Sequence, residues 1–394
     1  MFNEGFIDDR LRDWGDEPPY TPVIKVMGLG GGGSNAVDRM IDFGLYGVEF
    51  IIANTDRQAM VFSQAPVKLQ LGPQLTRGLG AGGDPGVGEA AALESKGDIA
   101  MALEGADMVF LTAGMGGGTG TGSIPVAAQV AKELGIITVA VVTKPFGFEV
   151  GGRQKNADEG LMKLQPHVNT LITIPNERLL QTVSETATLS EAFHLADDVL
   201  RQAVQSITEL ITQPGMINVD FAHIERVMKL GGGALMSIGQ ASGEEKAVSA
   251  IKQALYHPLL EDISLVNASG IIVNFTSGQD LTLMDIGKAL NYLQEQIPPD
   301  AEVIFGTTQN DHFQGRVQVN LIVTGLGATT FEDVFTSFTR EDRETPPPVQ
   351  RKAVKNNPGQ KEDLSSQRNE MSRDSLDVPA FMRRRAYANT QFGS

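Results

Sequence analysis

Two glycine-rich segments constrain most strongly what this chain can fold into. They cover residues 28–35 (GLGGGGSN) and 114–122 (GMGGGTGTG), and each follows a short apolar run and precedes a stretch with helical spacing. Glycine lets the backbone approach an anion closely, and a helix N-terminus adds free N–H groups and a positive dipole. Two such loops at the ends of neighbouring strands would grip a polyphosphate, with the hydroxyls of Thr119 and Thr121 as further donors.

The segments around these loops predict an α/β fold with a mainly parallel, doubly wound sheet. Continuous apolar strands, typical of a sheet buried on both faces, are expected at residues 23–27, 48–54, 106–114, 135–142 and 171–176. Helical spacing at 35–43 and 124–134 separates some of them, and a long helix is predicted over residues 189–212. A smaller α/β domain with some antiparallel pairing follows, with strands at 234–242, 270–277, 302–309 and 316–326 and helices at 244–255 and 283–295.

Composition divides the chain into six parts. We expect a flexible arm (1–21), a nucleotide-binding domain (22–188), the central helix (189–213), the smaller domain (214–328), a disordered linker (329–374) and a tail (375–394). The linker holds three consecutive prolines and many Ser, Asn, Gln and charged residues, with little to bury. The tail turns apolar (LDVPAFM) just before three arginines at 383–385, which is typical of a segment that a partner protein binds.

Composition also excludes several classes of protein and site. The chain has no cysteine, which excludes disulfides, thiolate metal sites and cysteine nucleophiles, and its five histidines lack metal-ligand spacing. The formal net charge of −16 argues against a nucleic-acid partner. No run approaches 18 apolar residues, and residues 1–20 lack the apolar core of a signal peptide. We therefore expect a cytoplasmic protein with no transmembrane segment.

Residues 28–33 also match the pattern G-x-G-x-x-G of nicotinamide-dinucleotide folds, in which Asp56 would bind the ribose. Such a fold uses one glycine loop, whereas this chain has two. No G-x-x-x-x-G-K-[ST] occurs, so a Walker-type NTPase is excluded. A nicotinamide-dependent oxidoreductase remains an alternative at this point.

The second loop contains GGGTGTG at residues 116–122, the signature of the tubulin/FtsZ family. Residues 23–326 resemble the bacterial cell-division members of that family through GGGGSNAV (30–37), NTD (54–56), GLGAGGDP (78–85), VVTKPFGFE (141–149), TIPN (173–176) and PGMINVDFA (214–222). The resemblance implies a tubulin-like fold with a GTP-binding domain over 22–188, a long central helix and a C-terminal activation domain over 214–328. It also implies a GTPase whose Mg²⁺ enters with the nucleotide; we assign no side chain to the metal.

The resemblance further implies which residues contact GTP. Those matching the loops on the phosphates are Gly31, Gly32, Gly33, Ser34, Asn35, Gly118, Thr119 and Gly120. Those matching the second-strand loop and the loop that senses the γ-phosphate are Asp56, Gly82 and Gly83. Those matching the ribose region and the guanine site are Glu149, Arg153, Asn176, Phe193 and Asp197. The Asp197 carboxylate would accept the guanine N1–H and exocyclic amine, a donor pair that adenine lacks.

The catalytic loop departs from the family pattern at one position. The family reads N-x-D-F-A-D and residues 218–223 read NVDFAH, so Asn218 and Asp220 match while His223 replaces the second acid. In the family this loop enters the nucleotide pocket of the next subunit and completes the hydrolytic site. Two hypotheses follow: a GTPase that hydrolyses GTP between successive subunits, and a GTP-binding filament subunit with weak or no hydrolysis.

The resemblance also implies partners and a location. The chain is expected to form a head-to-tail homopolymer with copies of itself. Its tail would bind membrane-anchoring and regulatory division proteins. The polymer would lie in the cytoplasm, at the mid-cell division ring that forms at the future septum.

Overall fold

The computed structural model describes residues 21–149, 151–182, 186–212, 219–231, 233–260, 265 and 268–326. The predicted arm up to residue 20, the linker and the tail lie outside the described residues, as does Asn218.

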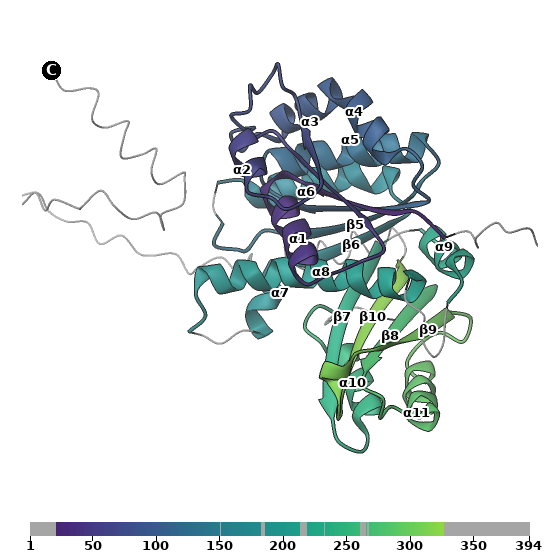
Figure 1. Ribbon diagram of the computed structural model, residues 1–394. Coiled ribbons are helices and arrows are strands. Elements are labelled where there is room, and N and C mark those ends of the chain that lie inside the picture. Colours follow the sequence, from purple (N-terminus) through teal and green to yellow (C-terminus); the bar gives the residue numbers. More distant parts are fainter. Residues whose placement is uncertain are drawn as a thin grey trace, which may run out of the picture. The chain divides into compact units, whose positions relative to one another are not determined.

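The described strands form one ten-stranded sheet in the order β3-β2-β1-β4-β5-β6-β7-β10-β8-β9 (Figure 1). Their bounds are β1 Ile24–Leu29, β2 Glu49–Asn54, β3 Val67–Gln70, β4 Met108–Gly114, β5 Ile137–Lys144, β6 Thr170–Pro175, β7 Gly233–Ser242, β8 Gly270–Ser277, β9 Glu302–Gln309 and β10 Arg316–Leu326. The pairings make every described strand parallel to its sheet neighbours except β10, which runs antiparallel to both β7 and β8. The predicted mixture of mainly parallel and some antiparallel pairing is confirmed.

The described α-helices connect and cover these strands. Their bounds are α1 Gly30–Asp42, α2 Arg57–Val61, α3 Pro85–Glu94, α4 Lys96–Leu103, α5 Thr119–Glu133, α6 Arg153–Leu164, α7 Asn176–Leu179, α8 Leu189–Thr212, α9 Phe221–Lys229, α10 Lys246–Leu255 and α11 Leu283–Gln294. None of the described helices is both long enough and apolar enough to cross a membrane.

The sheet is buried on both faces because its strands are apolar on both. In β1, Ile24 and Val26 face one side and Met27 and Leu29 pack into the other, as the two-residue period of a strand requires. Helices α1, α8 and α9 cover the first face, and that core reaches from β1 to β10. Helices α3 to α6 cover the second face of the first strands, and α10 and α11 cover that of the last strands.

Helix α8 runs along the sheet where the strands β1 to β6 meet the strands β7 to β10, as Figure 1 shows. It spans the 24 residues expected from its spacing of apolar residues. The sheet itself is also continuous at this point, because Leu171 and Ile172 of β6 pair with Gly233 and Ala234 of β7. The domain boundaries stay a prediction, since the strands on either side of them belong to one sheet.

Candidate functional site

The two glycine loops lie side by side at the carboxyl ends of β1 and β4. These strands are neighbours, with Leu29 opposite Ala113, and the helices that follow them begin at Gly30 and Thr119. A Cβ on Gly30, whose φ is +70°, would lie only 2.6 Å from the backbone nitrogen of Gly120. The strand order also reverses at β1 and β4, the position where doubly wound sheets bind ligands.

A cavity of about 440 Å³ opens at this position. The predicted residues among its lining are Gly31, Gly32, Asn35, Gly118, Thr119, Gly120, Glu149, Arg153, Asn176, Phe193 and Asp197. Further lining residues that were not among the predicted GTP contacts are Gly114, Met115, Gly117, Thr143, Pro145 and Ala196. Gly117, Thr143 and Pro145 belong to the motifs that carry the family resemblance, and Gly114 and Met115 to the second glycine-rich segment. Membership in these segments was the available signal for five of the six.

Five of the residues predicted to contact GTP do not line the cavity. Gly33 packs against the backbone of β4, because a Cβ there would lie 2.3 Å from the carbonyl oxygen of Thr112. The buried hydroxyl of Ser34 donates to the carbonyl of Gly30 at 2.8 Å, within α1 itself. The carboxylate of Asp56 caps α2 by accepting from the backbone N–H groups of Gln58 and Ala59.

Gly82 and Gly83 also lie outside the lining, both with positive φ and with open space where a Cβ would stand. Their loop nevertheless packs on the second glycine loop. A Cβ on Gly118 would lie 2.9 Å from both the Ala81 side chain and the backbone nitrogen of Asp84. The two loops therefore cannot shift independently of each other.

A hydrogen bond between two threonines joins the cavity to the loop after β2. The hydroxyls of Thr55 and Thr119 lie 2.6 Å apart, and Thr55 is fully buried. The carbonyl of Thr55 accepts from the backbone of Gly80 at 3.1 Å. Thr121 does not line the cavity; its hydroxyl accepts from the backbone N–H of Gly116 at 2.8 Å and so shapes the loop.

The far end of the cavity is aromatic and charged. Phe193 of α8 is 40% exposed and meets the buried ring of Phe146 edge to face, with centroids 5.4 Å apart. Glu149 accepts from the backbone N–H of Phe146 at 2.9 Å and forms an ion pair with Arg153. This arrangement offers a ring face beside a fixed ion pair.

Asp197 and Asn176 place polar groups next to Phe193. Arg39 of α1 donates through Nε to Oδ2 of Asp197 at 3.3 Å. Burial raises the pKa of Asp197 to about 6, and the attraction of Arg39 works against this rise. Asn176 is buried, and its Oδ1 has no hydrogen-bond partner among the described residues. A ligand with N–H donors would satisfy such acceptors.

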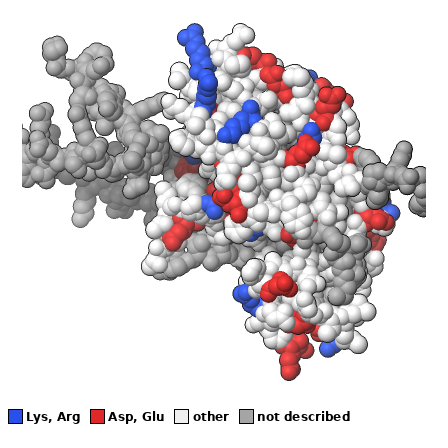
Figure 2. All heavy atoms as spheres, viewed as in Figure 1, with Lys and Arg blue, Asp and Glu red and all other residues white. Residues whose placement is uncertain are grey.

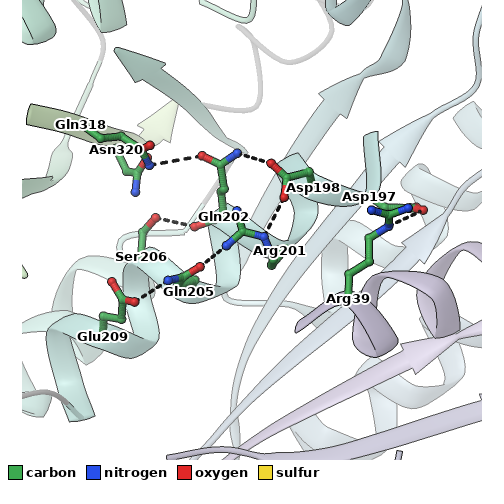
Figure 3. A network of polar contacts seen from close by, with 10 residues as sticks. All are labelled: Arg39, Asp197, Asp198, Arg201, Gln202, Gln205, Ser206, Glu209, Gln318 and Asn320. Carbon is green, nitrogen blue, oxygen red and sulfur yellow. Dashed lines mark hydrogen bonds and ion pairs between the residues drawn. The ribbon is translucent and has the colours of Figure 1, made fainter. Parts of the chain in front are cut away.

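A second polar group on α8 faces the last strands of the sheet. Figure 3 shows Asp198, Arg201, Gln202, Gln205, Ser206 and Glu209 linked in a chain that reaches Gln318 and Asn320 of β10. Burial raises the pKa of Glu209 in this network. These side chains hold α8 against β10 and do not line the cavity.

The catalytic loop of the prediction lies beyond the other end of α8. Asp220 precedes α9, makes no capping hydrogen bond with its side chain, and is exposed. His223, in the first turn of α9, is exposed too. Fifteen residues of helix separate Asp197 from Thr212, a rise of about 22 Å. The structure therefore does not bring Asp220 and His223 to the cavity of the same chain.

Charge is distributed without a large region of one sign on the face seen in Figure 2. Acidic and basic side chains are interspersed there among uncharged ones. Among the described residues, no group of three or more His, Cys, Asp and Glu side chains is placed to hold a metal ion. Backbone N–H groups and two helix N-termini are thus the main features of the cavity that suit an anion.

Two family models match the chain. The GTPase domain of the tubulin/FtsZ family matches residues 23–184, and the C-terminal domain of the FtsZ family matches residues 232–327. Cell division protein FtsZ of Rickettsia conorii is 50% identical over 308 residues, which are 78% of this chain and 68% of that protein. Cell division protein FtsZ of Caulobacter vibrioides is 47% identical over 313 residues, 79% of this chain and 62% of that protein.

A solved structure agrees with these sequence matches. The empty FtsZ dimer of M. jannaschii is similar with a TM-score of 0.76 and 42% identity. The match covers 81% of this chain and 92% of that one.

Proposed function

The chain belongs to the tubulin/FtsZ family, and from this premise we propose that it is a GTP-binding protein that polymerises head to tail and forms the division ring of a dividing cell. The observation that carries the proposal is the cavity in which the two glycine loops of neighbouring strands meet. The nicotinamide alternative loses its support, because its single-loop pattern is part of this two-loop site.

The cavity supports one placement of the nucleotide. The phosphates lie over Gly31 and Gly117, where a Cβ would meet no atom within 4 Å, at the N-termini of α1 and α5. Asn35 and the Thr119 hydroxyl donate to phosphate oxygens. The ribose lies near the Glu149–Arg153 pair. The base stacks on Phe193 and gives its donors to Asp197.

Hydrolysis in this proposal needs a second copy of the chain. Asp220 and His223 lie on the opposite end of α8 from the cavity, and both are exposed. A head-to-tail contact brings this end of one copy over the cavity of the next, and such a contact propagates rather than closes. Asp220 then orients the attacking water and accepts its proton, and Asn218 assists from the same loop.

Weak hydrolysis is the second candidate, favoured by His223. An imidazole keeps a hydrogen-bonding group on α9 but brings no negative charge to the water. Slow turnover would then leave long-lived filaments, with Asp220 as the single acid of the loop.

Magnesium, the tail and the location remain parts of the proposal. Mg²⁺ is usually bound through one or two carboxylates plus substrate phosphates, so we place it with the nucleotide. The tail at 375–394 binds membrane-anchoring and regulatory division proteins, and the polymer lies in the cytoplasm at mid-cell.

Sedimentation with GTP and Mg²⁺, compared with GDP and Mg²⁺, tests polymerisation, and phosphate measured in the same samples tests hydrolysis. We expect a pellet with GTP and none with GDP. A chain that stays monomeric with GTP at every concentration contradicts the proposal. A pellet without phosphate release selects the second candidate.

A further inference from the structure

Two consecutive aspartates of α8 point to different sides of the helix. Figure 3 shows Asp198 turned toward Arg201 and Gln202, at 2.7 and 2.6 Å, within the network that reaches β10. Asp197 is turned the other way, toward Arg39 of α1. Only Asp197 lines the cavity. The neighbouring carboxylates therefore have separate roles, and Arg39 is the partner of the one at the site.

Arg39 reaches the site only through Asp197. It does not line the cavity, and its side chain is mostly covered, with 24% exposed. Its Nε binds Oδ2 of Asp197, and the described part of the chain offers this carboxylate no other hydrogen bond. Oδ1 is thus left to accept from a ligand. Arg39 also stands on α1, four residues after the first glycine loop ends at Asn35, so one rigid helix fixes both the phosphate loop and the acid.

We propose that Arg39 is the positioning residue for base selection: it holds the Asp197 carboxylate in one orientation and ionised, so that guanine is bound and adenine is not. This inference rests on the proposed GTP-binding function. It adds to that function a residue of α1 that contacts the acid and not the base.

The chemistry of the two base edges explains why ionisation matters. A carboxylate only accepts, which suits the N1–H and 2-amino donors of guanine. A carboxylic acid donates once and accepts once, which suits the N1 acceptor and 6-amino donor of adenine. The ionised form of Asp197 therefore favours guanine, and the protonated form favours adenine. Asn176, with its buried and unpartnered Oδ1, independently indicates that this end of the cavity takes a donor-bearing ligand.

The surroundings of Asp197 support this role for Arg39. Burial favours the neutral acid, with a pKa of about 6, and Asp198 next to it on α8 acts in the same direction. Arg39 from α1 acts against both. The other charged groups lining the cavity, Glu149 and Arg153, are paired with each other. Removing Arg39 thus leaves a buried acid that is more often protonated near neutral pH.

The test uses the 394-residue chain and nucleoside diphosphates, so that assembly does not interfere. Titration calorimetry measures the affinities of GDP, IDP and ADP for the natural chain, Arg39→Gln and Arg39→Lys between pH 6 and 8. IDP lacks the 2-amino donor. We expect Arg39→Gln to lose about tenfold in GDP affinity, the value of one charge-assisted hydrogen bond, and to bind GDP and IDP nearly equally. Its GDP affinity should also rise from pH 6 to 8 more steeply than that of the natural chain.

Controls separate this role from a structural one. Arg226→Gln removes an ion pair of the same kind, with Glu302, on α9; it should leave all three affinities unchanged. Arg39→Lys keeps the charge and should keep most of the preference for GDP over ADP. In an Asp197→Asn background, Arg39→Gln should have no further effect on the GDP-to-IDP ratio.

The outcomes distinguish the two levels of the proposal. A natural chain that binds ADP as well as GDP overturns the proposed function. A natural chain that prefers GDP, with Arg39→Gln folded by circular dichroism and an unchanged GDP-to-IDP ratio and pH profile, overturns the role of Arg39 alone. Should Arg39→Gln not fold, Arg39→Met, which also removes the charge but keeps an unbranched apolar stem, takes its place in the same comparison.

Discussion

Helix α8 lines a cavity near its amino end, whereas its carboxyl end leads toward a loop whose acid and histidine are exposed. Near the cavity, Asp197 is paired with Arg39 and Phe193 packs against Phe146. At the other end, the side chain of Asp220 makes no capping bond, and His223 faces solvent. The residues around the cavity are therefore held in place for a ligand within one copy of the chain. Asp220, in contrast, has no neighbouring groups among the described residues that would hold its carboxylate against a reacting atom.

This difference indicates where the reaction is assembled. A catalytic acid is effective when its surroundings hold it against the reacting atoms. Buried and hydrogen-bonded residues surround the cavity, but among its described lining residues no carboxylate stands beside the glycine loops to activate a water molecule. The loop at residue 220 has an acid, but that acid is exposed. The proposed function therefore expects nucleotide binding from one copy of the chain and hydrolysis from two.

The largest expected effect comes from removing the acid of the loop. Asp220→Ala should lower GTP hydrolysis by about 10²–10⁴-fold, the usual value of a positioned acid or base, while GTP affinity stays the same. Phosphate release and nucleotide titration measure the two quantities. Glu244→Ala, which removes another exposed acid, is the control and should keep full activity.

A mixing experiment makes this prediction sharper. Asp220→Ala has an intact cavity, and a variant with a blocked cavity has an intact loop, so the mixture should recover part of the hydrolysis that each lacks alone. If the mixture stays inactive while both variants fold and copolymerise, the two-copy site is wrong.

A smaller effect, in the opposite direction, is expected from restoring the family acid. His223→Asp should raise GTP turnover by roughly tenfold or more, since a second carboxylate then faces the water, and should leave nucleotide affinity nearly unchanged. Turnover per subunit in assembled protein is the measurement, with His312→Asp, at another exposed histidine, as the control. Equal turnover of the two proteins would show that the replacement is silent.

Blocking the cavity should affect binding and not folding. A Cβ on Gly117 meets no atom within 4 Å, so Gly117→Val places its side chain in open space and into the cavity. We expect GTP affinity to fall about tenfold or more, equal to about 1.4 kcal/mol or more. Gly97→Val, at an equally open position on α4, is the matched control. Unchanged affinity in Gly117→Val would contradict the placement of the phosphates.

The sequence predicted the regular parts of both regions because their signals are local. Apolar runs gave most strands within two residues, and the glycine loops appeared where β1 and β4 end. The short strand β3 was missed, since VKLQ has no apolar run and half of it is exposed. Asp56 was predicted to lie near the nucleotide; in the structure its carboxylate caps α2, and a contact with the nucleotide stays a prediction.

Contacts between distant segments were beyond such signals. Arg39 and Asp197 are 158 residues apart, and their meeting depends on how α1 packs against α8. Whether Asp197 or Asp198 faces the cavity depends on the rotation of α8 about its axis. The residues next to them in the sequence do not indicate that rotation. The family resemblance selected Asp197, but its partner became visible only in the folded chain.

The smallest expected effect concerns stability and again separates the two ends of α8. Because burial raises the pKa of Asp197 from 3.8 to about 6, the folded chain binds more protons there than the unfolded chain between these values. The free energy of unfolding therefore falls as pH rises from about 4 to about 6, and the loss persists at pH 7. The full shift corresponds to about 3 kcal/mol; because the side chain is still 15% exposed, we expect Asp197→Asn to gain on the order of 1 kcal/mol at pH 7. Urea unfolding without nucleotide at pH 4.5 and pH 7 measures this gain, which should be smaller at the lower pH.

The control is Asp220→Asn, at the exposed end, which should change stability by less than about 0.5 kcal/mol at either pH. A gain at Asp197 that is equal at both pH values would mean that burial of the charge is not its cause. A gain confined to the higher pH would mean that the empty cavity keeps a destabilised charge, which a ligand with N–H donors then stabilises.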